Sequence, residues 1–301
     1  MTGAVTGSET QRRTRQGQLA ILAAAIVWSL AGLGQRELDA EPATQVAGRA
    51  IFAALALFLL VLATERRSTL AAFRSMDRWG AALAVSLGLS SGSFLFALSY
   101  TTVANILFMQ AAAPMMAALL GWTLLRERVD SRTWIALGLA AIGVAVMAVG
   151  SFEAGVAAIA LPFVVTASFA ATIVITRHRR EVSMLPAACT SQALVVLVCL
   201  PFLSLGSVAA GDWPIFAGLG VVQIGGGLAL LMIGARLIPP AQVAVISLLE
   251  LVLGPLWVWL AYAEEPATAT VVGGAVVVVA VLVQATGDLR RPRQAAAEAP
   301  A

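Results

Sequence analysis

The longest charge-free run in the chain constrains the fold more than any other feature. Residues 79–125 are 47 consecutive positions without Asp, Glu, Lys or Arg. As one α-helix this run would be roughly 70 Å long, more than twice the ~30 Å thickness of a bilayer's hydrocarbon core. The run must therefore fold back as two helices, and the polar segment Tyr100–Thr102 near its middle is the predicted turn.

The composition indicates whether these helices are surrounded by water or by lipid. Residues of the set AVILMFWYC make up 60% of the 301 residues and charged residues 12%, against roughly 45–50% and about 25% in soluble domains. A soluble globule so poor in charge could not cover its surface with polar groups. The sequence therefore predicts an all-α integral membrane protein, with the lipid bilayer as a partner.

Charged residues divide the rest of the chain into stretches of bilayer length. Five stretches are uncharged over 20 to 23 residues, and a sixth of 30 holds one helix and a loop. Two more carry one internal charge each, Arg49 and Glu250. Each stretch meets the ~20 residues that a helix needs to cross the core. With the folded-back run, the prediction is ten transmembrane helices.

The arginines predict the orientation. All nineteen basic residues are Arg, and with the N-terminus inside, seventeen fall in inner segments and only Arg36 in an outer one. Such a positive-inside bias predicts that the N- and C-termini are cytoplasmic. The predicted organisation is a cytoplasmic tail (1–16), a five-helix repeat (17–150), a second, inverted five-helix repeat (151–287) and a cytoplasmic tail (288–301).

Weak identities support the internal repeat. At a spacing of 137 residues Ala104 falls on Ala241 and Glu127 on Glu264, with Asn105 on Gln242 beside them, and at 141 Arg36 falls on Arg177 and Trp28 on Phe169. Each half holds five predicted spans, and since five is odd, the second copy must be inverted in the membrane. Inverted repeats with a site near the midplane are typical of secondary transporters.

A family resemblance is carried by Trp28-Ser29, by Arg49, and by the block Ala104–Glu127 with its counterpart Ala241–Glu264. In these features the chain resembles EamA-type ten-helix transporters of the drug/metabolite transporter superfamily, over about residues 17–287. The resemblance implies export of small metabolites, often amino acids, by a multi-pass protein of a bacterial inner membrane. It also implies a cavity lined by helices one to four and six to nine.

One position departs from the family pattern. The second block usually reads Glu-Pro in its middle, whereas here Glu250 precedes Leu251 and the proline comes at Pro255. A proline breaks the helical hydrogen-bond ladder. We therefore expect the kink of the ninth helix to shift by about one turn.

Polar or aromatic side chains at membrane depth are candidates for function because burying them is costly. Gln223 precedes the glycines 225–227, which allow local unwinding or close backbone approach, and tight packing explains them equally well. Glu250 is interpreted either as a proton, cation or amine site or as a hydrogen-bonded protonated acid. The predicted substrate-binding residues are Trp28, Ser91, Tyr100, Asn105, Gln110, Gln192, Gln223, Ser247 and Glu250.

Other charged or reactive residues have structural interpretations. Arg49 is interpreted as snorkelling to the outer interface, in preference to binding a substrate carboxylate. Cys189 and Cys199 lie about 15 Å apart along a helix, too far for a disulfide, and are expected to be core thiols. The only histidine, His178, is expected in a solvated charge run.

The sequence lacks the residues that several classes of membrane enzyme require. An intramembrane serine protease needs a nearby histidine, an aspartyl type needs two embedded Asp, and a phosphate-binding loop needs a Lys that the chain does not have. No spacing suits a metal. We expect no catalytic residue, metal, cofactor or nucleic-acid partner.

The sequence thus predicts a secondary transporter that exports small metabolites by alternating access through a central cavity. Amino acids with apolar, aromatic and other side chains are the expected cargo, with broad specificity and proton coupling as an option, and the resemblance extends to exporters of aromatic amino acids. The alternatives are a passive channel or facilitator for small polar solutes, or an exporter of another class such as drugs or nucleosides. The protein is expected to be a monomer or a homodimer.

Overall fold

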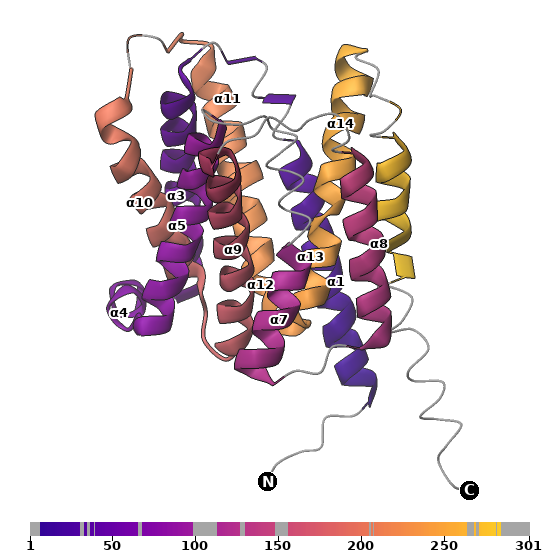
Figure 1. Cartoon of the computed structure of the whole chain (residues 1–301). Coiled ribbons are helices and arrows are strands. Elements are labelled where there is room, and N and C mark those ends of the chain that lie inside the picture. The colour runs from indigo at the N-terminus through magenta and orange to yellow at the C-terminus, as the bar shows by residue number, and fades with distance from the viewer. Residues whose placement is uncertain are drawn as a thin grey trace, which may run out of the picture.

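Every regular element in the part of the chain that the structure describes is a helix (Figure 1). The structure is a computed structural model. It describes residues 7–30, 33–34, 37–38, 40–65, 68–98, 113–126, 130–147, 156–204, 206, 208–263, 268, 271–280 and 282–283. The predicted turn Tyr100–Thr102 lies outside these residues.

The helices follow the apolar stretches of the sequence. The first half contains α1 (Gly7–Ser29), α3 (Pro42–Glu65), the short α4 (Thr69–Arg74), α5 (Arg78–Leu98), α7 (Ala113–Leu125) and α8 (Ser131–Met147). The second half contains α9 (Val156–His178), α10 (Leu185–Cys199) with the 3₁₀ turn η1 (Leu200–Phe202), α11 (Asp212–Gly218), the π-helix η3 (Leu219–Gly226), α12 (Gly227–Leu237), α13 (Pro240–Ser247) and α14 (Leu249–Tyr262). Residues 271–280 are helical as well.

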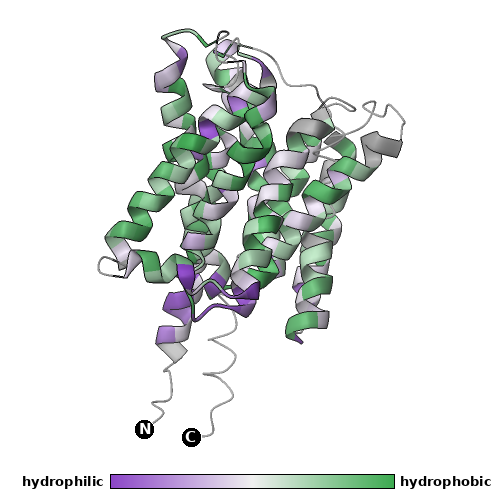
Figure 2. Ribbon diagram, turned by 90° about the vertical axis from the view of Figure 1, so that its left-hand side faces the viewer, coloured by the Kyte–Doolittle hydropathy of each residue, from purple (hydrophilic) through white to green (hydrophobic). Residues whose placement is uncertain are grey.

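Several of these helices have the length and hydropathy of membrane spans. Five described segments meet both requirements: Ala43–Thr64, Ala160–His178, Leu185–Phe202, Asp212–Leu237 and Pro240–Tyr262. Figure 2 shows the hydrophobic colours along the middle of the bundle and hydrophilic segments gathered toward one end. The membrane-protein class is thereby confirmed, while the count of ten spans and the location of the termini remain predictions.

The pattern of helix contacts repeats between the halves. The pair α1 and α12 has its equivalent in α9 and α5, and the pair α3 and η3 in α10 and α5. Likewise α9 packs on α7 as α1 packs on α13 and α14. Two further pairs, α3 with α10 and α7 with α13, join equivalent helices directly. Exchanging the halves therefore reproduces these contacts, as expected for a pseudo-two-fold axis, although α9 also packs on α12 and α13.

The halves are inverted relative to each other. The start of α1 lies against the end of α12, because a Cβ added at Gly17 would meet the Leu237 Cβ at 2.8 Å. The end of α9 is at the same place, since the Arg177 Nη1 donates to the Arg236 carbonyl at 2.9 Å. Thus α1 leaves this end of the bundle and α9 returns to it. We call it the Arg-rich end, after Arg177, Arg179, Arg180 and Arg236.

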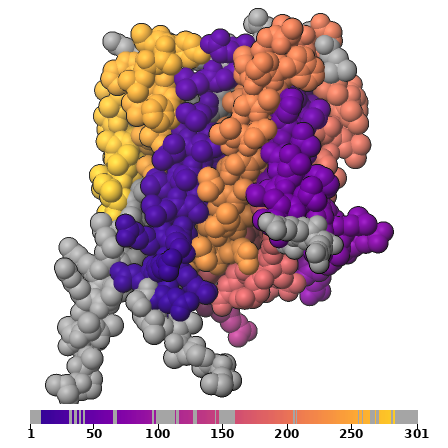
Figure 3. All heavy atoms as spheres, turned by 180° about the vertical axis from the view of Figure 1, so that it is seen from behind, coloured from indigo at the N-terminus to yellow at the C-terminus, as the bar shows by residue number. Residues whose placement is uncertain are grey.

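Glycines let the central helices touch along their backbones. In Figure 3, α1 lies between α14 on one side and α12 on the other, with α3 beyond α12. A Cβ at Gly234 would overlap Ile21 Cδ1, and one at Gly220 would overlap Phe52 Cβ. The glycines therefore set the spacing of the helices in both contacts.

The ninth span is interrupted in a place that the sequence did not predict. The amides of Leu248 and Leu251 donate to carbonyls three residues back, Val245 and Leu248, at 3.2 and 3.1 Å. The helix therefore tightens at Leu248, between α13 and α14, and α14 continues through Pro255. The tightened turn at Leu248 is an additional feature, and the predicted shift of the kink toward Pro255 stays a prediction.

Two glycines in one span provide a matched test of the close packing. We expect Gly220→Ala to destabilise the protein by about 1–3 kcal/mol, because the added carbon would lie 2.5 Å from the Arg49 carbonyl oxygen and could not be accommodated without helix movement. Gly218→Ala, two residues earlier, meets nothing within 4 Å and should cost nothing. Thermal unfolding in detergent measures both, and equal effects would contradict the packing.

Candidate functional site

Trp28 lies where the two halves meet. Its indole covers Gly227 so closely that a Cβ there would overlap Trp28 Nε1. Its ring also contacts Phe169 of α9 edge to face, with the centroids 6.0 Å apart. Trp28 and Phe169 are the positions that the 141-residue repeat spacing equates. Equivalent residues can touch only near the axis that relates them, so Trp28 lies close to the pseudo-two-fold axis.

Gln223 lies beside Trp28. The Gln223 Nε2 donates to the Trp28 carbonyl at 3.5 Å, and the side chain is 7% exposed. Its Oε1 is buried without a hydrogen-bond partner. The residue belongs to the π-helix η3, and single π segments recur at functional sites because they redirect side chains. Gln223 therefore offers an unused acceptor next to an aromatic surface at the repeat interface.

The glycines after Gln223 allow side chains of neighbouring helices to approach the backbone closely. Gly227 accommodates Trp28, and Gly225 would place a Cβ 3.2 Å from that of Ala56. The segment is a π-helix that continues directly into α12, so the chain there is not unwound. Of the two functional interpretations of the triplet, the structure supports close backbone approach.

Ser29 and Trp257 join α1 to α14 at the same level. The Trp257 Nε1 donates to Ser29 Oγ at 2.8 Å, and that hydroxyl donates in turn to the Ile26 carbonyl at 2.6 Å. Sequence reasoning did not include this pair, although Trp257 lies two turns after Glu250 on the same helical face. Gly254, between them, also faces α1, since its Cβ position lies 3.8 Å from the Ser29 carbonyl.

Glu250 therefore lies on the side of α14 that packs on α1. Residues at i, i+4 and i+7 share one helical face, and these are Glu250, Gly254 and Trp257. Glu250 is half-buried and follows the interruption at Leu248 by two residues. A carboxyl group in this position can exchange a proton or bind a cationic group as neighbouring helices move.

The other predicted site residues separate into three groups. Gln192 is buried in α10, on the face that meets α3, and its Nε2 donates to Ser191 Oγ at 3.2 Å. Ser247 donates its hydroxyl to the Val243 carbonyl of its own helix at 2.9 Å, and Ser91 is half-buried in α5. Tyr100, Asn105 and Gln110 lie outside the described residues. Among the predicted residues, the structure thus joins Trp28 and Gln223 and turns Glu250 toward α1.

Interpretations of the remaining reactive residues are confirmed in part. Cys189 and Cys199 are buried free thiols. His178 is exposed, as predicted, but its ring also packs on Trp79 with centroids 4.7 Å apart. The side of α3 that carries Arg49 is turned away from the exposed apolar side chains of that helix, and the interpretation of Arg49 as a snorkelling residue stays a prediction.

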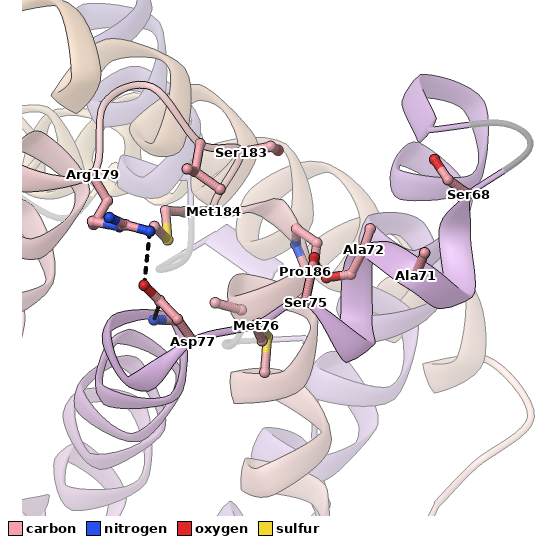
Figure 4. Close-up of a pocket in the computed structure, with 13 residues that line it drawn as sticks. Ser68, Ala71, Ala72, Ser75, Met76, Asp77, Arg179, Ser183, Met184 and Pro186 are labelled. Carbon is pink, nitrogen blue, oxygen red and sulfur yellow. Dashed lines mark hydrogen bonds and ion pairs between the residues drawn. The ribbon is translucent and has the colours of Figure 1, made fainter.

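A clasp of polar contacts joins the halves at the Arg-rich end. Arg179 Nη2 of the second half lies 2.8 Å from Asp77 Oδ2 of the first (Figure 4). Asp77 also caps α5, since its Oδ1 accepts the amides of Trp79 and Gly80 at 3.1 and 3.0 Å. The Arg236 Nε donates to the Arg180 carbonyl and ties in α12. The clasp therefore fixes three helix ends.

Hydrogen bonding holds the pKa of Asp77 below its ordinary 3.8. The largest cause is the Gly80 amide, with the Arg179 guanidinium adding to it and partial desolvation opposing it. A hollow of about 290 Å³ beside the pair is lined by α4 and the segment before α10, including Ser68, Ser75 and Ser183 (Figure 4). Trp28, Gln223 and Glu250 do not line this hollow.

Comparisons with known proteins agree with this architecture. The model of the EamA-like transporter family matches residues 15–149 and again residues 156–286. A solved crystal structure superposes with a TM-score of 0.78 at 18% identity, over 92% of this chain and 98% of the other. At that identity the likeness shows a common fold. The comparison with curated proteins gives no match.

The two roles of Asp77 can be separated by substitution. Asp77→Ala should lose about 0.5–2 kcal/mol, because it removes the helix cap. Asp77→Asn keeps an acceptor for the cap, and we expect it to lower the melting temperature less, to the same extent as Arg179→Gln, because a half-exposed ion pair contributes little. Arg180→Gln is the control, since that side chain is exposed.

The stability that ionised Asp77 contributes is expected to fall at low pH. Because the folded-state pKa of Asp77 is lowered, its ionic contribution is present above the ordinary value of 3.8 and is lost as pH falls through the folded value. The difference in melting temperature between the parent and Asp77→Asn should therefore hold down to about pH 4 and disappear below it. A difference that vanishes near neutrality would contradict this assignment.

Proposed function

The chain belongs to the EamA-like transporter family, and we propose that it exports small zwitterionic metabolites by alternating access. Amino acids with apolar or aromatic side chains are the proposed cargo. The observation that carries the proposal is the contact between Trp28 and Phe169. It brings aromatic surface and the unused Gln223 acceptor to the repeat interface, where inverted-repeat transporters bind their solutes.

The chemistry of this interface suits a net-neutral solute of mixed polarity. Trp28, Phe169 and Trp257 supply ring faces and edges for an apolar side chain. Gln223 Oε1 can accept a hydrogen bond from an ammonium group. Among the described residues near this level, Glu250 is the one carboxylate, and it would balance an ammonium or carry a coupled proton.

The packing supports alternating access over a fixed pore. Equivalent helix pairs, such as α1 with α12 and α9 with α5, could exchange geometries when the halves tilt. A tilt of that kind opens one end as it closes the other. The Asp77–Arg179 clasp would close the Arg-rich end in the present arrangement.

We further propose that the Arg-rich end faces the cytoplasm of a bacterial cell, with the protein in the inner membrane. The support is the arginine bias of the sequence. The two segments matched by the family model, 15–149 and 156–286, are taken as the inverted repeats.

Counterflow in proteoliposomes tests the transport function directly. We expect liposomes loaded with unlabelled phenylalanine to accumulate labelled phenylalanine transiently, and other apolar amino acids to compete, because a carrier exchanges solutes through a saturable site. Empty liposomes control for leakage. Linear, unsaturable uptake would indicate a channel instead, and exchange of nucleosides or drugs without amino acids would overturn the proposed cargo.

The substitution Glu250→Gln tests whether Glu250 couples the transfer of a proton to the exchange of solute. The amide keeps size and hydrogen bonding but cannot titrate, so we expect a folded protein whose exchange no longer depends on pH. Ser247→Ala is the matched control one turn away, since the Ser247 hydroxyl is bonded within its own helix. If Glu250→Gln shows the parent's pH profile, Glu250 is a packing residue.

A further inference from the structure

Arg49 lies on the inner side of α3. Exposed apolar side chains of this helix recur at helical spacing and mark the lipid-facing side; they are Ile51, Leu55, Phe58, Leu59 and Leu62. Arg49 shares the opposite face with Ala53 and Ala56, at i+4 and i+7. The Arg49 side chain therefore leaves α3 on the side that faces the interior of the bundle.

Two other helices meet this face of α3. On one side runs η3, where the Cβ position of Gly220 lies 2.5 Å from the Arg49 carbonyl oxygen, and that of Gly225 lies close to Ala56. On the other side runs α10, whose Cys189 Sγ donates to the Ala54 carbonyl at 3.4 Å. Arg49 thus lies at the junction of α3, η3 and α10, within the interface of the two repeats.

Nothing in the described part of the chain neutralises this charge. The Arg49 Nε is buried without a hydrogen-bond partner, and the ion pairs found among the described residues involve other arginines. An arginine at membrane depth is costly unless an anion or several acceptors face it. The arrangement calls for an anionic group from outside the protein.

We propose that Arg49 binds the carboxylate of the transported solute, an inference that rests on the proposed function and names the solute's second recognition group. A guanidinium holds a carboxylate with two parallel hydrogen bonds. Gln223 is three residues beyond Gly220 in η3, and the Cβ position of Gly220 lies against the Arg49 backbone. Arg49 and Gln223 therefore belong to adjacent helices about one turn apart, and in this proposal the guanidinium takes the carboxylate of the solute while Gln223 Oε1 takes its ammonium.

The proposal explains why a half-buried guanidinium and a buried free acceptor occur on neighbouring helices. Each lacks a partner within the described residues, and one zwitterion supplies both partners at once. Trp28 contacts Gln223 through its carbonyl, and the part of its half-buried ring that Gly227 and Phe169 do not cover is proposed to meet the solute's side chain. Solutes without a carboxylate would leave the guanidinium unpaired and should be rejected.

The experiment compares an amino acid with its own amide. Counterflow of phenylalanine and of phenylalaninamide is measured for the parent, Arg49→Gln, Arg49→Lys and Arg74→Gln, the last being an exposed arginine of α4. We expect the parent to prefer the acid at least tenfold in KM. Arg49→Gln should raise the KM for the acid at least tenfold and the KM for the amide less than threefold. Arg49→Lys should retain part of the preference, and Arg74→Gln all of it.

A measurement on the parent alone covers the case in which Arg49→Gln does not fold. Phenylalanine should raise the melting temperature of the purified parent, and phenylalaninamide at the same concentration should not. Equal stabilisation by acid and amide, or an unchanged KM for the acid in Arg49→Gln, overturns the role of Arg49 and leaves the proposed transport intact. Failure of every amino acid to exchange overturns the proposed function and this inference together.

Discussion

Backbone contact at glycines is the constraint on which the rest of the structure depends. Lipid tails are as apolar as leucine, so the hydrophobic effect does not hold transmembrane helices together, and close packing has to do so. In this protein Gly220, Gly227 and Gly234 bring η3 and α12 against α3 and α1. The same contacts place Trp28 and Gln223 side by side, so the glycines that hold the bundle together also build the candidate site.

The helix contacts of one half have equivalents in the other half. Because α1 with α12 is equivalent to α9 with α5, a change in one pair has a matching change in the other. Trp28 and Phe169 meet near the axis, where such an exchange moves residues least. The clasp of Asp77 and Arg179 lies at the Arg-rich end, where α5 begins and α9 ends. In the proposed alternating access, the centre would move least and this end most.

Charge is distributed in keeping with this division. Arginines gather at the Arg-rich end and bond to helix-terminal carbonyls and to a capping carboxylate. In the interior, Arg49 and Glu250 lie on different helices, both on sides that face other helices and not lipid. Half-buried groups of opposite charge that form no ion pair with each other are expensive in a structural role. In the proposed function, a zwitterionic solute would supply the carboxylate that Arg49 lacks.

Much of the fold follows from hydropathy along the chain. The 47-residue run without charge must turn back, because no bilayer is thick enough for it, and the odd number of predicted spans per half requires inversion. The helices α3, α9 and α10 follow from apolar stretches of the expected length. These features depend only on local hydropathy and on the thickness of the bilayer, so a linear sequence contains them.

The site was only partly accessible to the same reasoning. Trp28, Gln223 and Glu250 could be selected because polar or aromatic groups at membrane depth are rare. The bond between Ser29 and Trp257 could not, since it joins residues 228 positions apart. The tightened turn at Leu248 occurs without a proline, so no residue type marks it.

The sequence by itself determined which segments are apolar enough to span a bilayer and predicted that the halves are inverted, because hydropathy and the predicted number of spans are properties of the linear chain. Only the tertiary structure decided which way Arg49 faces. One side of α3 faces lipid, and the other side faces two other helices. The depth of Arg49 in the membrane, which the sequence predicts, does not say on which of these two sides it lies. The direction follows from where η3 and α10 pack, which glycines and alanines on three different helices decide together.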